Sequence, residues 1–582
     1  MAGHRGQNGA QEMAPAAHPG RSAAHVTVPT AHPGRSTAHE TTSTARASRN
    51  ALTTGSTEDD PGSYRDALNS SLNKQWKEAM RQEYASLIEN STFTPVTNTN
   101  GMKPIGCRWV YKTKRNPNGT IRYKARLVIK GYEQIRGVDF DETYAPVGKL
   151  ITLRYLLSFA AQNSYKIDHL DVVTAFLNPE IDTEVYMQLP EGIEWLESTA
   201  MPSGNRDCFL RLNKALYGLR QAPRLWHQEI DGFLQSIGFH RSHADISLYI
   251  RDDGVLILLY VDDILVFYAE EASEKALEVK QRLMLQYKMS NLGPAKQFLG
   301  LEIDRLADGT ITLSQPGYIS TILARFNMQD ANPAPTPLHP KNRLDIDASD
   351  AEEEVDQALY QSIVGSLMYA AIGTRPDIAF AVAALSRYNV KPYRVHLTAA
   401  KRVLRYLKAT ADVKLVFPST TSTEASPLVG YTDSDFAGDR ADRKSQGGHI
   451  FKVYGAPISW LSRKQGLVAF STTEAEYIAC SDATREAEWQ IRLHMDVTGE
   501  TVVPTIYCDS NGVLKTIYSA VSSPKTKHIN IRYHISRDWQ ERRIVNFTDI
   551  STDDNLADIM TKALGPEKHQ HFATSISLRS KL

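Results

Sequence analysis

The sequence predicts a multidomain protein of mixed helix and sheet (α+β and α/β) behind a disordered N-terminus. Its 582 residues are too many for one hydrophobic core and correspond to about three or four domains of about 150 residues each. A hydrophobic content of 42% and a charged content of 23% are those of an ordinary globular protein. Strand-like apolar runs alternate with amphipathic helical stretches over most of the chain.

Composition and charge argue against a membrane-spanning or secreted protein and are compatible with a protein that binds nucleic acid. The chain has no run of about 18 apolar residues, so we expect no transmembrane helix, and its N-terminus lacks the apolar core of a secretory signal. The four cysteines lie far apart without a CxxC pair, which predicts reduced thiols without a metal or disulfide role. The formal net charge is zero, yet residues 101–136 hold ten Lys or Arg residues and one acid. That density can follow nucleic-acid phosphates, although a solvated basic face has the same composition.

The first segment, residues 1–62, is predicted to be disordered. It is rich in Ala, His, Thr, Ser, Gly and Pro, and it contains AHPGRS at residues 17–22 and again at 31–36. Such a composition cannot bury a hydrophobic core. We expect no metal at its histidines, because no ordered scaffold positions them.

Residues 72–325 are predicted to form the first globular region. Trp76, Met80, Tyr84 and Leu87 follow one another at spacings of four, four and three, which is typical of an amphipathic helix. Two basic strands then flank the turn sequence Asn-Pro-Asn-Gly at residues 116–119 and form a hairpin. The other elements expected here are helices at 152–162, 223–237 and 272–286, a buried strand at 167–173, and paired strands at 298–305 and 310–314.

Residues 255–268, VLILLYVDDILVFY, are two strand-like apolar runs interrupted only by Asp262 and Asp263. Adjacent carboxylates in an apolar hairpin repel each other and cost several kcal/mol to desolvate unless a cation lies beside them. Carboxylate oxygens are the ligands that magnesium-type cations prefer. The segment therefore predicts a metal-dependent site at the tip of a buried hairpin.

A third carboxylate, Asp171, ends an apolar strand in the segment DHLDVVTAF at residues 168–176. Two-metal phosphoryl transfer needs carboxylates from separate strands, so that one cation serves the attacking hydroxyl and one the leaving group. Asp171, Asp262 and Asp263 can supply them. Taken alone, Asp171 is better explained as the N-cap of the segment that follows it.

A Pro-rich and acidic linker at residues 326–358 is followed by a helical segment at 359–425. Helices are expected at 360–372, 376–388 and 396–409. The third helix has a basic side, which fits either contact with a duplex backbone or a solvated surface. This side consists of Lys401, Arg402, Arg405 and Lys408.

The last region, residues 428–570, is predicted to begin with strands and to continue with a long helix at 473–493. Four carboxylates recur here at strand ends, at the start of the long helix and in the segment NLADIMTK. They are Asp433, Glu474, Asp509 and Asp558. Each of them, taken alone, is better explained as a solvated surface acid.

Together these segments resemble the reverse transcriptase and RNase H part of the Pol polyprotein of copia-type (Pseudoviridae) LTR retrotransposons. The resemblance covers residues 72–570 and rests on ordered blocks that include WKEAMRQEYASL, YKARLVIKGYEQ, LDVVTAFLN, LNKALYGLRQAPRLW, LLYVDDILV, YTDSDFAGD, STTEAEYIA and NLADIMTK. It implies a right-hand polymerase with fingers, palm and thumb, followed by a helical connection and an RNase H-like domain. No protease, integrase or capsid region is recognisable, so we expect a fragment or a truncated copy of the usual polyprotein.

The resemblance implies that Asp171, Asp262 and Asp263 are the catalytic triad of the palm. Asp171 and Asp262 are then direct metal ligands and Asp263 lies near the primer end, while Tyr260 and Val261 shape the primer side of the hairpin.

The resemblance also implies contacts with the incoming nucleotide. Phe176 would abut the sugar and reject a 2′-hydroxyl, with a plain core phenylalanine as the alternative. Gln221 would contact the nucleotide, and Lys124 and Arg126 would clamp its triphosphate.

In the last region the resemblance implies an RNase H site for hydrolysis of a phosphodiester, with Asp433, Glu474, Asp509 and Asp558 as catalytic residues and metal ligands. Asp435 and Glu476 are the rivals, because each lies two residues from an assigned ligand. The segment TKHINIRYH is expected to touch the RNA–DNA hybrid through Lys525, Lys527, His528, Arg532 and His534.

The implied function is RNA-directed DNA synthesis coupled to degradation of the RNA strand. The implied cofactor is Mg²⁺, two per site, with Mn²⁺ as the alternative. The implied partners are an RNA template, a DNA primer, the RNA–DNA hybrid and deoxynucleoside triphosphates, without a membrane. The implied location is a cytoplasmic virus-like particle or the nucleus. Two other hypotheses stay open, namely an inactive or domesticated relic that binds nucleic acid without turnover, and a nuclease alone.

Overall fold

The computed structural model describes residues 60–115, 120–196, 208–341, 344–345, 355–420, 426–519 and 531–580. Several predictions lie outside the described residues: the low-complexity segment up to residue 59, the turn at 116–119, most of the acidic run before residue 355, Lys525, Lys527, His528 and the side chain of Arg532. Within the described ranges, no helix is both long and apolar enough to cross a membrane.

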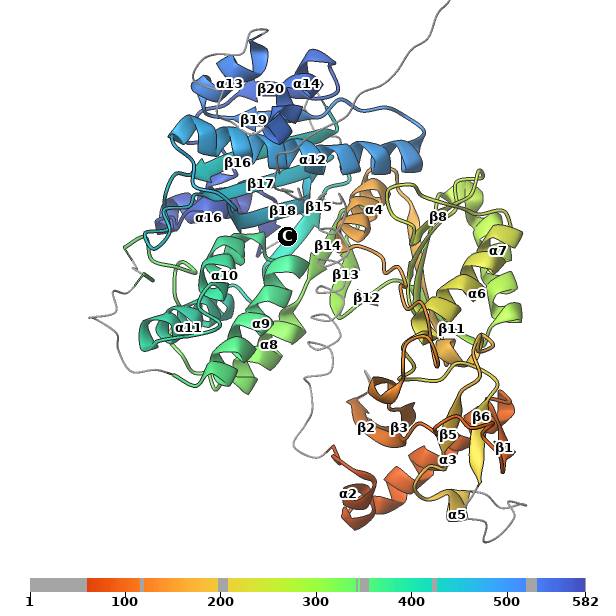
Figure 1. Ribbon diagram of the computed structural model, residues 1–582. Coiled ribbons are helices and arrows are strands. Elements are labelled where there is room, and N and C mark those ends of the chain that lie inside the picture. Colours follow the sequence, from red (N-terminus) through yellow and green to blue (C-terminus); the bar gives the residue numbers. More distant parts are fainter. Residues whose placement is uncertain are drawn as a thin grey trace, which may run out of the picture.

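The N-terminal module packs an amphipathic helix against two small sheets at one end of the molecule (Figure 1). The predicted spacing is confirmed, because Trp76, Met80, Tyr84 and Leu87 are all buried on one side of α3. Trp76 makes edge contacts with Tyr111 of the basic hairpin. The elements are α2 (Tyr64–Asn69), α3 (Asn73–Glu89), the hairpin β2 (Cys107–Arg115) and β3 (Ile121–Ile129), the sheet β1 (Phe93–Val96), β6 (Phe209–Leu212) and β5 (Tyr186–Gln188), and the short α5 (Ile193–Leu196).

A six-stranded antiparallel sheet follows, and both of its faces are covered by helices. Residues of α6 and α7 pack on one face and residues of α4 on the other. Burial on both faces explains why the hairpin sequence is apolar at every position instead of alternating. The strand order is β11 (Met289–Pro294), β4 (Lys166–Val172), β10 (Asp263–Tyr268), β9 (Leu256–Tyr260), β8 (Leu248–Ile250) and β7 (His240–Arg241); the helices are α4 (Leu150–Gln162), α6 (Ala222–Ser236) and α7 (Ser273–Gln286).

A five-stranded sheet joins three distant parts of the chain. Its order is β12 (Gln297–Phe298), β13 (Leu301–Arg305), β14 (Ile311–Ser314), β15 (Lys414–Phe417) and β21 (Leu578–Arg579). The last strand, β21, comes from the C-terminal end and pairs with β15, which lies far earlier in the sequence. A helical cluster surrounds a separate hydrophobic core and consists of α8 (Pro316–Arg325), α9 (Gln357–Gly373), α10 (Ala379–Ser386) and α11 (Arg394–Ala409).

The basic side of α11 contacts the preceding Pro-rich segment. Arg402 donates to the backbone carbonyl of Thr336, at 3.1 Å. Arg405 and Lys408 donate to other carbonyls of the same segment. Three of the four cations therefore hold residues 331–336 against the helix while staying partly exposed, and contact with a duplex stays a prediction.

The C-terminal region is a five-stranded sheet covered by the long helix α12 (Figure 1). Strands β16, β17 and β18 are antiparallel neighbours, whereas β19 and β20 continue from β16 in parallel. The elements are β16 (Leu428–Asp435), β17 (Gln446–Val453), β18 (Ala456–Lys464), α12 (Thr472–Thr498), β19 (Thr505–Cys508), α13 (Asn511–Tyr518), α14 (Ile535–Glu541), β20 (Asn546–Asp549), α15 (Asp558–Thr561) and α16 (Pro566–Ser575).

Helix α4 also docks on the C-terminal sheet. Arg154 is buried, and its guanidinium donates to the carbonyls of Ile458, Ile372 and Gly373 at 2.6 to 3.0 Å while it stacks over Trp460. Ser158 donates to the carbonyl of Val453 and the hydroxyl of Tyr155 pairs with His494. These contacts join the six-stranded sheet and the C-terminal sheet into one block.

Candidate functional sites

The first candidate site lies at the tip of the predicted hairpin. Strands β9 and β10 pair so that Tyr260 faces Asp263, which leaves Val261 and Asp262 as the two turn residues. On the other side, β10 pairs with β4 so that Asp263 faces Asp171. The backbone N–H of Val172 donates to the carbonyl of Asp262 at 2.8 Å. The register thus brings the three predicted acids together from two neighbouring strands and the turn between β9 and β10.

The turn itself is held in an uncommon backbone conformation. Val261 has a φ of 60°, in the left-handed region, which is costly for a β-branched residue. The indole N–H of Trp226, on α6, donates to the carbonyl of Val261 at 2.6 Å. The packed helix therefore fixes the position of the turn and with it the position of Asp262.

The acids at this tip are partly exposed, in contrast to the fully buried pair that the sequence suggested. The Asp263 side chain keeps 28% of its surface exposed and bonds His169 at 2.9 Å. Burial raises the pKa of Asp171 and of Asp262, and the neighbouring Asp263 raises both further. Mutually repelling carboxylates that remain open to solvent are a donor set that fits a divalent cation.

Two cations of the basic hairpin face these acids from the N-terminal module. Lys124 and Arg126 are two residues apart on β3, so their side chains lie on the same face of the strand. Lys124 interacts electrostatically with Asp171, and Arg126 with Asp262. Burial and the nearby Arg126 lower the pKa of Lys124 to about 8. The structure therefore places both predicted phosphate-binding cations opposite the acidic tip.

Phe176 lies beside this charged space, in the 3-10 turn after β4. It is partly exposed and contacts the edge of Tyr217, with ring centroids 5.2 Å apart. Arg126 lies over the same Tyr217 ring at 4.6 Å. The placement suits a residue that borders a substrate space, and the sugar-sensing role stays a prediction.

Gln221 is placed differently from the other predicted nucleotide contacts. It has no exposed surface, and its amide donates to the carbonyl of Asp139 at 2.9 Å. Its carbonyl accepts from Gln134 at 3.0 Å. Direct contact with a nucleotide would require these bonds to open, so in this structure Gln221 holds the neighbouring loop, and its predicted contact stays untested.

The second candidate site lies at the edge of the C-terminal sheet. Asp433 is buried on β16, where it accepts a hydrogen bond from the hydroxyl of Thr561. Burial, with smaller contributions from Asp558 and Asp509, raises its pKa to about 6 despite the opposing effect of Lys562. Three of the four predicted carboxylates are therefore close enough to influence one another.

The structure places Glu476, the rival in the sequence analysis, near the other acids of this site, whereas the sequence favoured Glu474. The Glu474 side chain accepts from the backbone N–H of Phe470 at 2.7 Å, and Ser471 accepts from the N–H of Glu474. Both bonds stabilise the start of α12, because Ser471 is its N-cap and the Glu474 carboxylate holds the N–H of the residue before that cap. Glu476 is the residue whose pKa is raised well above its usual range, by burial first and then by Asp433, Cys508 and Asp509. The S-T-T-E pattern was the signal in the sequence that could have assigned Glu474 to the cap.

Asp558 is less available than predicted, because two lysines occupy its carboxylate. Lys562 lies 2.8 Å from one oxygen and Lys568 lies 3.0 Å from the other. Lys562 also lies 3.5 Å from Asp433. The rival Asp435, on the same strand as Asp433, interacts with Lys562 as well. Sequence reasoning did not identify either lysine, although Lys562 follows Asp558 by four residues; Lys568 comes from the next helix, α16.

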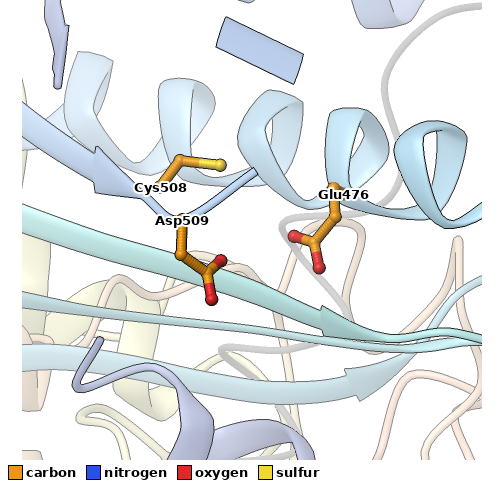
Figure 2. Close-up of side chains that lie close together, drawn as sticks. All are labelled: Glu476, Cys508 and Asp509. Carbon is orange, nitrogen blue, oxygen red and sulfur yellow. The ribbon is translucent and has the colours of Figure 1, made fainter. Parts of the chain in front are cut away.

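Cys508 is a further residue that sequence reasoning missed. Glu476, Cys508 and Asp509 present one ligand atom each within 4.8 Å of one another (Figure 2). Cys508 is the last residue of β19 and is fully buried, whereas Asp509 follows the strand and is partly exposed. Of the predicted hybrid-binding residues, His534 lies against α12 and bonds Tyr477 at 3.0 Å.

Known proteins resemble this chain over most of its length. A family model described as reverse transcriptase (RNA-dependent DNA polymerase) matches residues 90–340. The retrovirus-related Pol polyprotein from transposon TNT 1-94 of Nicotiana tabacum is 38% identical over 537 residues, which are 90% of this chain and 39% of that protein. The chain thus spans about two fifths of that relative. A transposon Ty5-1 protein of Saccharomyces cerevisiae is 36% identical over 321 residues, which are 54% of this chain and 100% of that protein.

One solved structure contains an RNase H domain. It is the N-terminal RNase H domain of a Mycobacterium tuberculosis protein, fused to maltose-binding protein, and it is 14% identical with a TM-score of 0.18. The alignment covers 26% of this chain and 99% of that chain. At that score the likeness adds nothing to the geometry of the C-terminal carboxylates.

Proposed function

Because the chain belongs to the Pol polyproteins of Ty1/copia-type retrotransposons and carries their reverse transcriptase domain, we propose that it copies RNA into DNA at the palm tip and cleaves the RNA strand at the C-terminal site. The palm is the six-stranded sheet with α4, α6 and α7. Its partners are then an RNA template, a DNA primer and deoxynucleoside triphosphates. A cytoplasmic virus-like particle or the nucleus is the location that this family membership suggests.

The observation that carries the polymerase proposal is the meeting of opposite charges at the hairpin tip. Asp171 and Asp262 would hold Mg²⁺ or Mn²⁺, which activates the 3′-hydroxyl and offsets charge on the leaving pyrophosphate. Lys124 and Arg126 approach from the opposite module and interact electrostatically with those acids. Their charge suits the triphosphate, which lies between them and the tip in this proposal.

The neighbouring residues give the palm site its selectivity. Phe176 borders the space next to Tyr217, where a ring would exclude a ribose 2′-hydroxyl. Trp226 fixes the turn through its bond to Val261, so the acidic tip does not move when substrate binds. Gln221 keeps the loop of Gln134 and Asp139 in place through its amide.

At the C-terminal site, Asp433, Glu476 and Asp509 are the residues that would hold Mg²⁺. Their donor set fits the cation, because all three are carboxylates and Glu476 has a buried oxygen without a hydrogen-bond partner among the described residues. Asp558 holds Lys562 beside Asp433 and binds Lys568 with its other oxygen. The two lysines then neutralise part of the charge that a nucleic-acid phosphate brings to the site.

Primer extension tests the polymerase proposal, and cleavage of an RNA–DNA hybrid tests the nuclease proposal. The purified chain is given a primed RNA template, deoxynucleotides and Mg²⁺, and in parallel a labelled RNA–DNA hybrid. We expect Asp262→Asn to stop extension and to leave RNA cleavage intact, and Asp509→Asn to do the reverse. Absence of both activities in the unmodified chain would favour a relic that binds without turnover, and equal activity in variant and parent would remove the assigned residue from its site.

A further inference from the structure

The geometry points to a soft-metal site at the edge of the C-terminal sheet. We propose that Glu476, Cys508 and Asp509 bind a zinc-like divalent cation, and that this cation displaces magnesium and stops RNA cleavage. Metal binding is argued from these three side chains and does not depend on a nuclease activity. The inhibitory part rests on the proposed nuclease function.

Two chain segments converge to form this site, the start of α12 and the end of β19. Glu476 lies in the second turn of α12, Cys508 ends β19, and Asp509 follows directly after that strand. Figure 2 shows the Cys508 sulfur beside the helix that carries Glu476, whereas the Asp509 carboxylate points the other way from the backbone and lies on the side of the Glu476 carboxylate. Their ligand atoms all lie within 4.8 Å of one another, which is close enough for one cation to bridge them after small side-chain rotations.

A second observation points to a missing ligand. The Oε2 atom of Glu476 is buried and has no hydrogen-bond partner among the described residues. An orphaned buried oxygen costs about 1 to 3 kcal/mol, and more when it is charged. Asp433 and Asp509 surround it with like charge. A cation at this position would pair the orphaned oxygen and relieve the repulsion.

The thiol decides which cation fits best. Magnesium takes oxygen ligands in an octahedral shell and gains nothing from sulfur. Zinc-like cations accept mixed thiolate and carboxylate ligands in a tetrahedral shell, and three protein ligands leave a fourth position for water. On binding, a metal–sulfur bond forms and the Cys508 thiol releases its proton to solvent.

Cys480 supports the thiolate from behind. It lies one helical turn after Glu476 on the same side of α12, is fully buried, and hydrogen-bonds Cys508 through its own thiol. A hydrogen bond donated to sulfur stabilises the deprotonated form that metals need. Asp509 and Glu476 are partly exposed, so a cation can reach the site from solvent.

Cobalt(II) is the probe, because its bond to a thiolate gives a charge-transfer absorbance that oxygen ligands do not give. The full chain, kept reduced, is titrated with Co²⁺ alone. We expect the thiolate band in the parent chain, its loss in Cys508→Ser, and its retention in Cys208→Ser, a buried cysteine of the N-terminal module. No band in the parent, or a band that persists in Cys508→Ser, would overturn the site.

A measurement on the parent chain covers the case in which Cys508→Ser fails to fold. X-ray absorption at the zinc edge should show a sulfur ligand at about 2.3 Å. A shell of oxygen and nitrogen ligands alone would overturn the proposal.

Inhibition then tests the consequence. Micromolar Zn²⁺ added to the Mg²⁺-dependent cleavage reaction should stop the parent, and Cys508→Ser should need at least about tenfold more Zn²⁺. Primer extension should persist at the same Zn²⁺ concentration, because the palm acids offer only oxygen ligands. A cobalt band without RNA cleavage would support the metal site and contradict the nuclease function. RNA cleavage without a cobalt band would support the nuclease function and contradict the metal site.

Discussion

The palm tip and the C-terminal site both gather carboxylates at strand ends, but they balance the charge in different ways. At the palm, the acids stay partly open to solvent and their opposing cations, Lys124 and Arg126, belong to another module. At the C-terminal site, Asp433 and Asp558 are buried and their cations come from the same short segment, Lys562 and Lys568. The acids of the palm therefore depend on cations of another module, whereas the acids of the C-terminal site are partly neutralised by lysines of their own region.

The largest expected effect separates the two acids of helix α12. Glu476→Gln should lower RNA cleavage by more than about 100-fold, because removal of a direct ligand costs more than removal of a supporting group. Its matched control, Glu474→Gln, should cost only about 1 kcal/mol of stability through the weakened cap. Hybrid cleavage and thermal melting measure the two results. Equal loss of cleavage in both variants would contradict the assignment of Glu476.

The next prediction tests whether helix α4 joins the six-stranded sheet and the C-terminal sheet, which carry the two sites, into one block. Arg154→Met removes the donor of three buried carbonyls and should lower the free energy of unfolding by about 3 kcal/mol. Burial lowers the pKa of Arg154 to about 9, because the charged guanidinium is removed from water. Arg492→Met, at an exposed ion pair with Glu488, is the control and should cost less than about 1 kcal/mol. Urea unfolding that gives equal values for both variants would show that α4 does not hold the sheets together.

A smaller effect follows from the pKa of Asp433. Because the folded pKa is raised to about 6, the carboxylate becomes neutral as the pH falls through 6 and can no longer hold a cation. The affinity of the C-terminal site for Mg²⁺ should therefore fall by about tenfold per pH unit below 6. Magnesium titrations of hybrid cleavage, repeated at several pH values from about 7.5 down to about 5, measure this affinity. An affinity that stays constant over that range would mean that Asp433 is not a ligand.

The smallest effect concerns the strained turn of the palm. Val261→Gly replaces a β-branched residue in the left-handed region with one that adopts this conformation without strain. The more flexible unfolded chain offsets this gain, so the free energy of unfolding should change by less than about 1 kcal/mol. Extension should slow a few-fold because Asp262 is held less firmly, while RNA cleavage in the same preparation stays unchanged. Faster extension would show that the strain serves no purpose at this tip.

The sequence by itself determined most of the local structure and indicated which three acids meet at the hairpin tip. An apolar run around two adjacent aspartates is readable without contacts, because the period of a strand and the cost of desolvating charge are local properties. The same holds for the amphipathic α3, whose buried residues follow the predicted spacing. The ordered motifs also indicated the reverse transcriptase family, which the relatives bear out.

Only the tertiary structure decided which charges face one another. The choice of Glu476, the pairing of Asp558 with two lysines, the carbonyls held by α11 and the thiol of Cys508 at the second site all depend on segments distant in sequence. A helix presents several polar residues around its axis, and its own period cannot show which of them meets a strand end or a neighbouring loop. Those meetings are set by the packing of whole sheets and helices, so the partners of each charge appear only in the folded chain.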